Sequence, residues 1–196
     1  MASWSEGYIT DVPYTSGFYR ELTPAWLAFT ALIGGQRPPD LARPFRWAEL
    51  GCGGGLTTNI VAATNPHADV WGFDFNPAHI EDATRLASAA GLANVHFREA
   101  SFADIARDSS LPQFDFIVAH GVYSWIAPHF RDDLLAFIGR HLAPGGLVYI
   151  SYNTPTGWDA MAPLQHLMRM LAKDMQGRSD QLMPAILDRI ERLVDS

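Results

Sequence analysis

The chain has 196 residues but only one cysteine, few charged residues and no long apolar run. Because Cys52 is the only cysteine, an internal disulfide framework and a cluster of thiolate metal ligands are excluded. Charged residues make up 18% of the chain, the net charge is −7, and the basic clusters typical of nucleic-acid-binding proteins are missing. No apolar run approaches the roughly 18 residues that a membrane-spanning helix requires. The first residues lack the basic and apolar regions of a signal peptide, so these absences predict a cytoplasmic domain without nucleic-acid partners or membrane insertion.

What the chain does contain is apolar and periodic. Hydrophobic residues make up 48% and aromatic residues 12%, which is enough for one substantial core and excludes disorder. Short apolar runs predicted as strands alternate with segments of helical periodicity. The strands are predicted at 45–50, 69–73, 95–97, 114–119 and 147–152, and the helices between them at 57–64, 77–90 and 131–142. This alternation predicts a Rossmann-like, doubly wound α/β fold with a mostly parallel sheet.

The segments on either side of these strands read as helical. Residues 1–44 are predicted to form an N-terminal helical lid, with one helix over Phe18–Ile33 that is irregular at Pro24. Residues 45–158 form the predicted core, and 159–196 contain two C-terminal helices, at 162–173 and 180–194. Because no sixth or seventh strand follows, we expect the fold to be truncated here. The last strand would then be a sheet edge, so we expect self-association through it or its coverage by the final helices.

A glycine-rich loop follows the first predicted strand. The sequence Glu49-Leu50-Gly51-Cys52-Gly53-Gly54-Gly55 lies where parallel strands bind ligands, beside Asp74 at the end of the next strand. Leu56 stands where the dinucleotide motif requires glycine, and Glu49 would repel a pyrophosphate, so a nicotinamide oxidoreductase is disfavoured. S-adenosylmethionine, with a ribose and positive charge but no phosphate, suits the loop better. A purely structural glycine turn is the alternative.

Individual residues can be matched to parts of such a cofactor. Asp74 is expected to accept hydrogen bonds from both ribose hydroxyls, and Ser101 to meet the exocyclic amine of adenine. Phe102 and Phe75 are candidates for the two faces of the adenine ring, with a place in the core as the alternative for Phe102. The predicted cofactor contacts are Tyr14, Glu49, Gly51, Cys52, Gly53, Asp74, Phe75, Ser101, Phe102 and His120.

Several strings of the sequence resemble class I S-adenosylmethionine-dependent methyltransferases. They are E-L-G-C-G-G-G at 49–55, G-F-D-F-N-P at 72–77, F-D-F-I-V-A-H at 114–120 and L-A-P-G-G-L-V-Y-I-S-Y at 142–152. The strings H-G-V-Y-S-W at 120–125 and S-Y-N-T at 151–154, with Pro13-Tyr14 and Gly157-Trp158, resemble bacterial methyltransferases that carry a C-terminal methyltransferase regulatory domain. That group includes protein-lysine methyltransferases acting on outer-membrane proteins. The resemblance implies S-adenosylmethionine as cofactor, S-adenosylhomocysteine as product and a protein lysine as acceptor.

This chain departs from that group in two places. Family members continue well past this length, and they usually have Tyr-Pro-Gly-Trp or Leu-Pro-Gly-Trp where residues 155–158 read Pro-Thr-Gly-Trp. Both departures bear on the acceptor rather than on the cofactor. A small-molecule N- or O-methyltransferase and a non-catalytic S-adenosylmethionine-binding module therefore stay open as alternatives.

The candidate catalytic residues are His120 and Tyr123, which follow the predicted strand 114–119. His120 suits a general base for an amine or hydroxyl nucleophile, and a hydrogen bond to the methionine moiety of the cofactor is the alternative. The seven histidines show no metal-binding spacing, so no metal is expected. The predicted substrate contacts are Trp125, Tyr152, Asn153 and Trp158.

Overall fold

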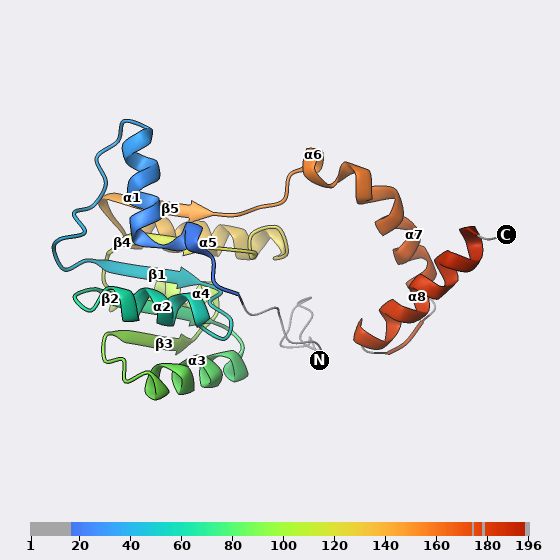
Figure 1. Ribbon diagram of the computed structural model, residues 1–196, viewed down its shortest axis with the longest axis horizontal. Helices are drawn as coiled ribbons and strands as arrows, with labels where there is room; N and C mark the ends of the chain where they lie inside the picture. The colour runs from blue at the N-terminus through green and yellow to red at the C-terminus, as the bar shows by residue number, and fades with distance from the viewer. Residues whose placement is uncertain (1–16, 174, 178, 195–196) are drawn as a thin grey trace. The chain divides into compact units, whose positions relative to one another are not determined.

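The computed structural model describes residues 17–173, 175–177 and 179–194 of the chain (Figure 1). These residues divide into two compact units between Tyr152 and Asn153. The division lies before residue 158, where the sequence places the end of the core. Tyr14, one of the predicted cofactor contacts, lies outside the described residues.

The larger unit is built on a parallel sheet of five strands in the order β3-β2-β1-β4-β5 (Figure 1). The strands are β1 Arg46–Leu50, β2 Asp69–Asp74, β3 Val95–Glu99, β4 Phe114–Ala119 and β5 Leu142–Ile150. Every neighbouring pair runs parallel, and Ala48 in the central strand aligns with Trp71 on one side and Ile117 on the other. The predicted doubly wound α/β fold is therefore confirmed.

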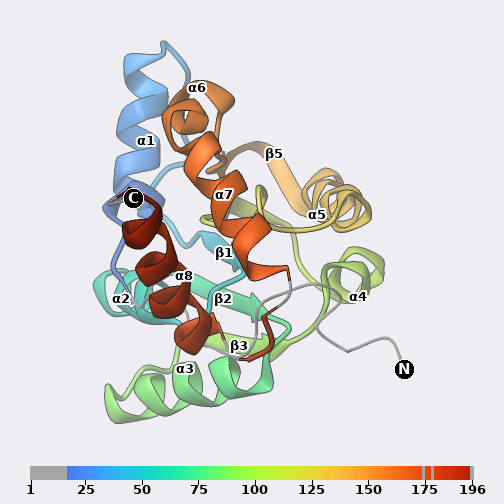
Figure 2. The ribbon, with the colours of Figure 1, turned by 90° about the vertical axis from the view of Figure 1, so that its right-hand side faces the viewer.

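Helices cover both faces of this sheet, and Figure 2 shows α2 and α3 on one face with α4 and α5 on the other. Their bounds are α2 Leu56–Thr64, α3 Pro77–Ala89, α4 Phe102–Arg107 and α5 Pro128–His141. Helix α3 begins as predicted, with Pro77 in the first turn and the Asn76 side chain accepting from Ala78 N at 3.0 Å. Helix α4 was not predicted. A reciprocal capping box between Ser101 and Asp104 starts it.

The N-terminal residues of the larger unit pack on the sheet. They form a 3-10 turn, η1 Arg20–Leu22, and then helix α1 Pro24–Ile33, with the break at the predicted Pro24. Trp47 Nε1 in β1 donates a hydrogen bond to Leu22 O at 3.0 Å, and Leu22 is fully buried. These contacts fix η1 to the sheet, next to the start of α1.

The core has an aromatic cluster on one face of the sheet and a mixed apolar cluster on the other. Phe73 on β2 and Phe114 on β4 pack against Phe137 of α5, with ring centroids 5.8 to 6.5 Å apart. The opposite cluster joins the sheet to α1 and α2 through Leu22, Leu27, Phe45, Trp47, Val61, Ala62, Ala68, Val70, Phe116 and Val118. Burial of this much apolar surface is the main force that holds the strands in register.

Strand β5 begins at Leu142, earlier than the predicted 147–152, because Leu142 already pairs with Phe114. A register irregularity follows, and Pro144-Gly145-Gly146 lies within the strand rather than before it. A Cβ on Gly146 would come 2.9 Å from Ala143 O and 3.0 Å from Asp115 O, so only glycine fits this close backbone approach. Among the described strands β5 pairs with β4 alone and is a sheet edge.

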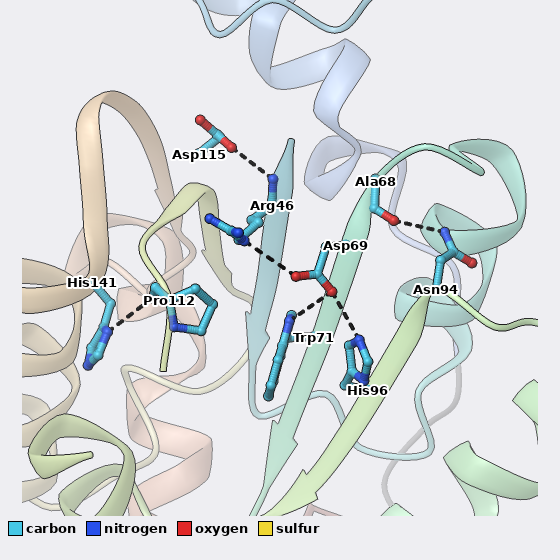
Figure 3. Close-up of polar contacts among 9 residues, drawn as sticks. All are labelled: Arg46, Ala68, Asp69, Trp71, Asn94, His96, Pro112, Asp115 and His141. Atoms are coloured by element: carbon cyan, nitrogen blue, oxygen red, sulfur yellow. Dashed lines mark hydrogen bonds and ion pairs between the residues drawn. The ribbon is translucent and has the colours of Figure 1, made fainter. Parts of the chain in front are cut away.

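A polar network joins the amino ends of the strands (Figure 3). Asp69 accepts from Trp71 Nε1 at 3.1 Å and pairs with His96 Nε2 at 3.0 Å, while its other oxygen lies 3.4 Å from Arg46 Nε. Asp115 Oδ2 accepts from the backbone N of Arg46 at 2.8 Å. The partners come from β1, β2, β3 and β4, so this network aligns the beginnings of these four strands.

The smaller unit is helical where it is described. Its elements are α6 Pro155–Trp158, η2 Asp159–Met161, α7 Ala162–Ala172 and α8 Ser179–Val194. Helices α7 and α8 agree with the two predicted C-terminal helices, whereas α6 and η2 were not predicted. Within the described residues, no helix is long and apolar enough to cross a membrane.

Candidate active site

The glycine loop turns back across the carboxyl ends of β1 and β2. Gly51 N and Cys52 N both donate to Phe73 O, at 2.8 and 3.0 Å, which holds the loop against β2. Gly55 has a φ of 69°, and a Cβ there would lie 2.5 Å from Ala83 Cβ and 2.8 Å from the Phe97 ring. Gly53 also has a positive φ, of 52°, but nothing lies within 4 Å of the Cβ it lacks. Gly55 therefore packs the loop on α3, while Gly53 leaves open space for a ligand.

Asp74 is held in place beside this open space. Its Oδ2 accepts from Gly53 N at 2.9 Å, and its Oδ1 accepts from Asn76 N at 2.9 Å and from His79 Nδ1 at 3.2 Å. The residue is only 7% exposed, so these donors fix the carboxylate in one orientation. A carboxylate offers about four lone pairs and three donors already bind this one, so capacity remains for about one further donor such as a ribose hydroxyl. The same contact raises the pKa of His79.

Glu49, at the end of β1, is a buried acid that has no cationic partner among the described side chains. It is 5% exposed, and its hydrogen bond comes from Thr58 Oγ1 at 2.5 Å. Burial raises the pKa of Glu49 to about 8, and the neighbouring Asp74 carboxylate adds to the rise. Glu49 therefore carries its proton at neutral pH in the ligand-free chain. A cation placed beside it would stabilise the ionised form.

Cys52 lies inside the loop as a buried residue. Burial raises the pKa of the Cys52 thiol well above its usual range, and the nearby acids Glu49 and Asp74 raise it further. Its Sγ faces Gly53 O at 3.6 Å. Such a thiol stays protonated and is a poor nucleophile, so the side chain serves the loop by its small size.

The predicted adenine contacts lie at the same end of the sheet. Ala100 N donates to Asp74 O at 3.0 Å, which places the residues after β3 beside Asp74. The Ser101 hydroxyl donates to Asp104 Oδ2 at 2.6 Å and accepts from Asp104 N at 3.2 Å. Its proton is therefore already used in capping α4. Phe75 and Phe102 are half-buried, next to Asp74 and Ser101 in the chain.

His120 follows β4 and is enclosed by two tyrosines. Its ring lies 4.0 Å from the Tyr19 ring and 6.3 Å from the Tyr149 ring, between centroids. The His120 Nδ1 atom is buried and has no hydrogen-bond partner within the described part of the chain. Burial lowers the pKa of His120, with a smaller opposing effect from Glu21. The imidazole is therefore neutral at neutral pH and free to accept a proton.

The loop between β4 and α5 carries the other predicted mouth residues. Gly121 N donates to Ser151 Oγ at 2.8 Å, which ties this loop to the end of β5. The Tyr123 ring lies 6.5 Å from the Tyr152 ring and 5.2 Å from the guanidinium carbon of Arg131. Trp125 and Tyr152 are 61% and 64% exposed, so this end of the sheet presents large aromatic surfaces to solvent.

The larger unit does not contain all of the predicted site residues, and three residues near His120 were not predicted. Tyr14 is outside the described residues, and Asn153 and Trp158 belong to the smaller unit. The Tyr19 and Tyr149 rings pack near His120 and the Glu21 charge acts on it. These three residues were not predicted, because no local motif marks them. No group of three metal-ligating side chains occurs in the part of the chain that the structure describes.

Comparison with known proteins decides the family. The profile of a family described as a methyltransferase domain matches residues 48–148, slightly more than half of the chain. The chain belongs to this methyltransferase domain family. The match runs from Ala48 within β1 to Val148 within β5, and it includes the glycine loop, Asp74 and His120.

Relatives of this methyltransferase domain point the same way. An uncharacterized protein of Synechocystis sp. is 44% identical over 98% of this chain and 37% of its own length. A trans-aconitate 2-methyltransferase of Methylobacterium nodulans is 33% identical over 67% of this chain and 46% of the enzyme. The structure of PKMT2 from Rickettsia typhi in complex with AdoHcy superimposes with a TM-score of 0.77 and 28% identity, covering 92% of this chain and 34% of that protein.

The methyltransferase domain thus spans between a third and a half of the length of these relatives. The predicted class, a class I S-adenosylmethionine-dependent methyltransferase domain, is confirmed, and with it the cofactor. The roles of individual residues and the acceptor stay predictions.

Proposed function

We propose that this chain is the catalytic core of a methyltransferase that transfers the methyl group of S-adenosylmethionine to a protein lysine. The observation that carries the proposal is the fixed Asp74 carboxylate, anchored to Gly53 N at 2.9 Å beside the open space at Gly53. A buried carboxylate next to open space suits a ligand with hydroxyl donors. The buried Glu49 suits a ligand that also carries positive charge, which would restore its ionised form.

The residues present fit this cofactor along one edge of the sheet. Gly51, Cys52 and Gly53 would face the methionine moiety through their backbone, with Glu49 nearby as the negative charge. Asp74 would bind the ribose. Adenine would lie against Phe75 and Phe102 with Ser101 at its edge, and Tyr14 would add a contact from the N-terminal segment.

S-adenosylmethionine supplies an electrophilic methyl group, so the chain chiefly has to align an acceptor and remove a proton. His120 is the candidate base, since its imidazole is neutral and lies at the end of β4. Tyr123 lies in the following loop, with its ring near Tyr152. It would orient the acceptor nitrogen toward the methyl group.

The exposed aromatic residues support a lysine acceptor. Trp125 and Tyr152 present apolar faces beside Tyr123, and such faces bind both the methylene stem and the charged end of a lysine. Asn153 and Trp158, from the smaller unit, are the further predicted substrate contacts. The similarity to PKMT2 of Rickettsia typhi also supports this acceptor class.

One observation favours a second candidate, a small carboxylate acceptor. The Arg131 guanidinium lies over the Tyr123 ring, its Nε is buried without a partner, and no described acid forms an ion pair with it. An arginine in this state fits a carboxylate. The trans-aconitate 2-methyltransferase relative makes that acceptor class relevant.

Calorimetric titration with S-adenosylhomocysteine tests the cofactor site. We expect micromolar binding that Asp74→Ala abolishes, whereas Asp82→Ala, an exposed acid paired with Arg85 on α3, leaves it unchanged. Binding that survives Asp74→Ala would contradict the proposed site.

Methyl transfer from labelled cofactor then identifies the acceptor. The labelled methyl group should be incorporated into lysate protein. Acetylation of the lysines of the lysate beforehand should block this incorporation. Transfer to trans-aconitate instead would favour the carboxylate acceptor. Cofactor binding without methyl transfer to either acceptor would indicate a non-catalytic S-adenosylmethionine-binding module.

A further inference from the structure

The N-terminal segment Gly17–Leu22 reaches the catalytic end of the sheet. Tyr19 N lies 3.4 Å from Thr57 Oγ1, and the same hydroxyl donates to Gly17 O at 3.3 Å. Thr57 is in the first turn of α2, directly after the glycine loop. At the other end of the segment, the buried Leu22 accepts a hydrogen bond from Trp47 Nε1 through its backbone oxygen. These anchors place residues 19–21 beside the loop and beside His120.

The Tyr19 ring packs against the His120 ring at a tilt. The two ring centroids are 4.0 Å apart with a 37° tilt, and Tyr149 lies on β5 at 6.3 Å with a 24° tilt to the same imidazole. Three segments distant in sequence therefore meet at one imidazole ring. This packing limits the rotation of the His120 ring and shields it from water.

Glu21 supplies the negative charge in this group. A backbone hydrogen bond and the Arg20 side chain, at 3.1 Å, lower the pKa of Glu21, so it is ionised at neutral pH. Its charge interacts with both His120 and Tyr149. The imidazole thus has the Tyr19 ring from the N-terminal segment and the Tyr149 ring from β5 beside it. The Glu21 carboxylate, paired with Arg20, acts on it through its charge.

We propose that Tyr19 and Glu21 are positioning residues for His120. Tyr19 fixes the plane of the imidazole, and Glu21 stabilises the imidazolium that forms during methyl transfer. This inference rests on the proposed function, in which His120 accepts the proton of the acceptor. Tyr19 and Glu21 belong neither to the glycine loop nor to the ends of the strands. The proposal therefore adds the N-terminal segment to the active site.

Charge balance explains why a carboxylate belongs at this place. The acceptor nitrogen gives one proton to His120 as the methyl group takes its place, so the positive charge that leaves the sulfonium appears on the imidazole. Burial alone disfavours that charge. A fixed carboxylate opposes this penalty only in the charged state, so it favours the transition state over the ground state.

Nuclear magnetic resonance titration of the histidine rings tests the arrangement without turnover, using His120→Gln to assign the signal. We expect Glu21→Gln to lower the pKa of His120 by roughly half a unit. Tyr19→Leu should raise it, because the ring loses its cover, and Tyr19→Phe should restore the original titration. Asp40→Asn, which removes an exposed acid paired with Arg43, is the matched control and should leave the titration unchanged.

Kinetics on the same variants complete the test. In Glu21→Gln the acidic limb of the kcat profile should move to lower pH while the maximal kcat falls about threefold, the value that half a pKa unit corresponds to. An unchanged His120 titration in Glu21→Gln would overturn the proposal, and so would a shifted titration with an unchanged kcat. S-adenosylhomocysteine binding by the unsubstituted chain tests the proposed function separately, since the titration is read without ligand.

Discussion

The acidic residues at the two ends of the sheet differ in burial and in their basic partners. At the amino ends, Asp69 is paired with Arg46 and His96, all of them 39% exposed or more. At the carboxyl ends, Glu49 and Asp74 are 5% and 7% exposed, and His79 is the one described basic side chain that pairs with either. Burying two acids so close together costs stability unless a ligand compensates. The comparison teaches that one end is built for alignment and the other for a cationic, hydroxyl-bearing ligand.

The largest expected difference between the two ends is in the stability cost of replacing a glycine. Gly55→Ala places a Cβ 2.5 Å from Ala83 Cβ at a positive φ, so we expect it to lower the free energy of unfolding by about 3 kcal/mol. Gly91→Ala, before β3, has a similar φ of 65° but open space, and should cost only about 1 kcal/mol. Urea denaturation measures both. Equal losses would mean that loop packing is not what distinguishes Gly55.

Replacing one acid at each end by its amide tests whether only the carboxyl end of the sheet binds the ligand. Asp74→Asn should weaken S-adenosylhomocysteine binding about 30-fold, since roughly 2 kcal/mol is lost when charge-assisted hydrogen bonds become neutral ones. Asp69→Asn should leave the affinity unchanged. Calorimetry on both variants decides this, and an equal effect at both positions would break the comparison.

The buried Glu49 predicts a pH dependence of stability. Its pKa rises from 4.5 to about 8 on folding, so between these values the folded state holds a proton that the unfolded state has lost. The free energy of unfolding of the ligand-free chain should therefore fall steadily as pH rises through this range. Glu49→Gln should remove the slope. A slope that persists in that variant would assign it to other groups.

The β5 edge carries the smallest prediction. Self-association through this strand stays a prediction, based on its single partner β4 and on Val148 being 39% exposed. Val148→Lys should weaken such association by roughly tenfold or less, because a lysine at an edge disfavours strand pairing. Sedimentation equilibrium measures it. A monomer at all concentrations in the unsubstituted chain would contradict the prediction.

Local signals in the sequence were enough for most of the fold. Helix α3 could be predicted because Asn76 and Pro77 start it and Gly91 ends it through short-range chemistry. The glycine loop and Asp74 could be predicted because the carboxyl ends of neighbouring parallel strands meet at one edge. Helix α4 was missed because it spans only six residues, too few for a periodic pattern.

What the sequence by itself determined is the order of strands and helices, the methyltransferase motifs and the class of ligand. Only the tertiary structure decided the early start of β5, the burial of Glu49 and the meeting of Tyr19, Glu21 and Tyr149 at His120. These features depend on contacts between segments far apart in the chain, and periodicity and local propensity carry no record of such contacts. The physical reason is that burial and electrostatic environment belong to the packed structure, whereas a residue's type and its neighbours belong to the sequence.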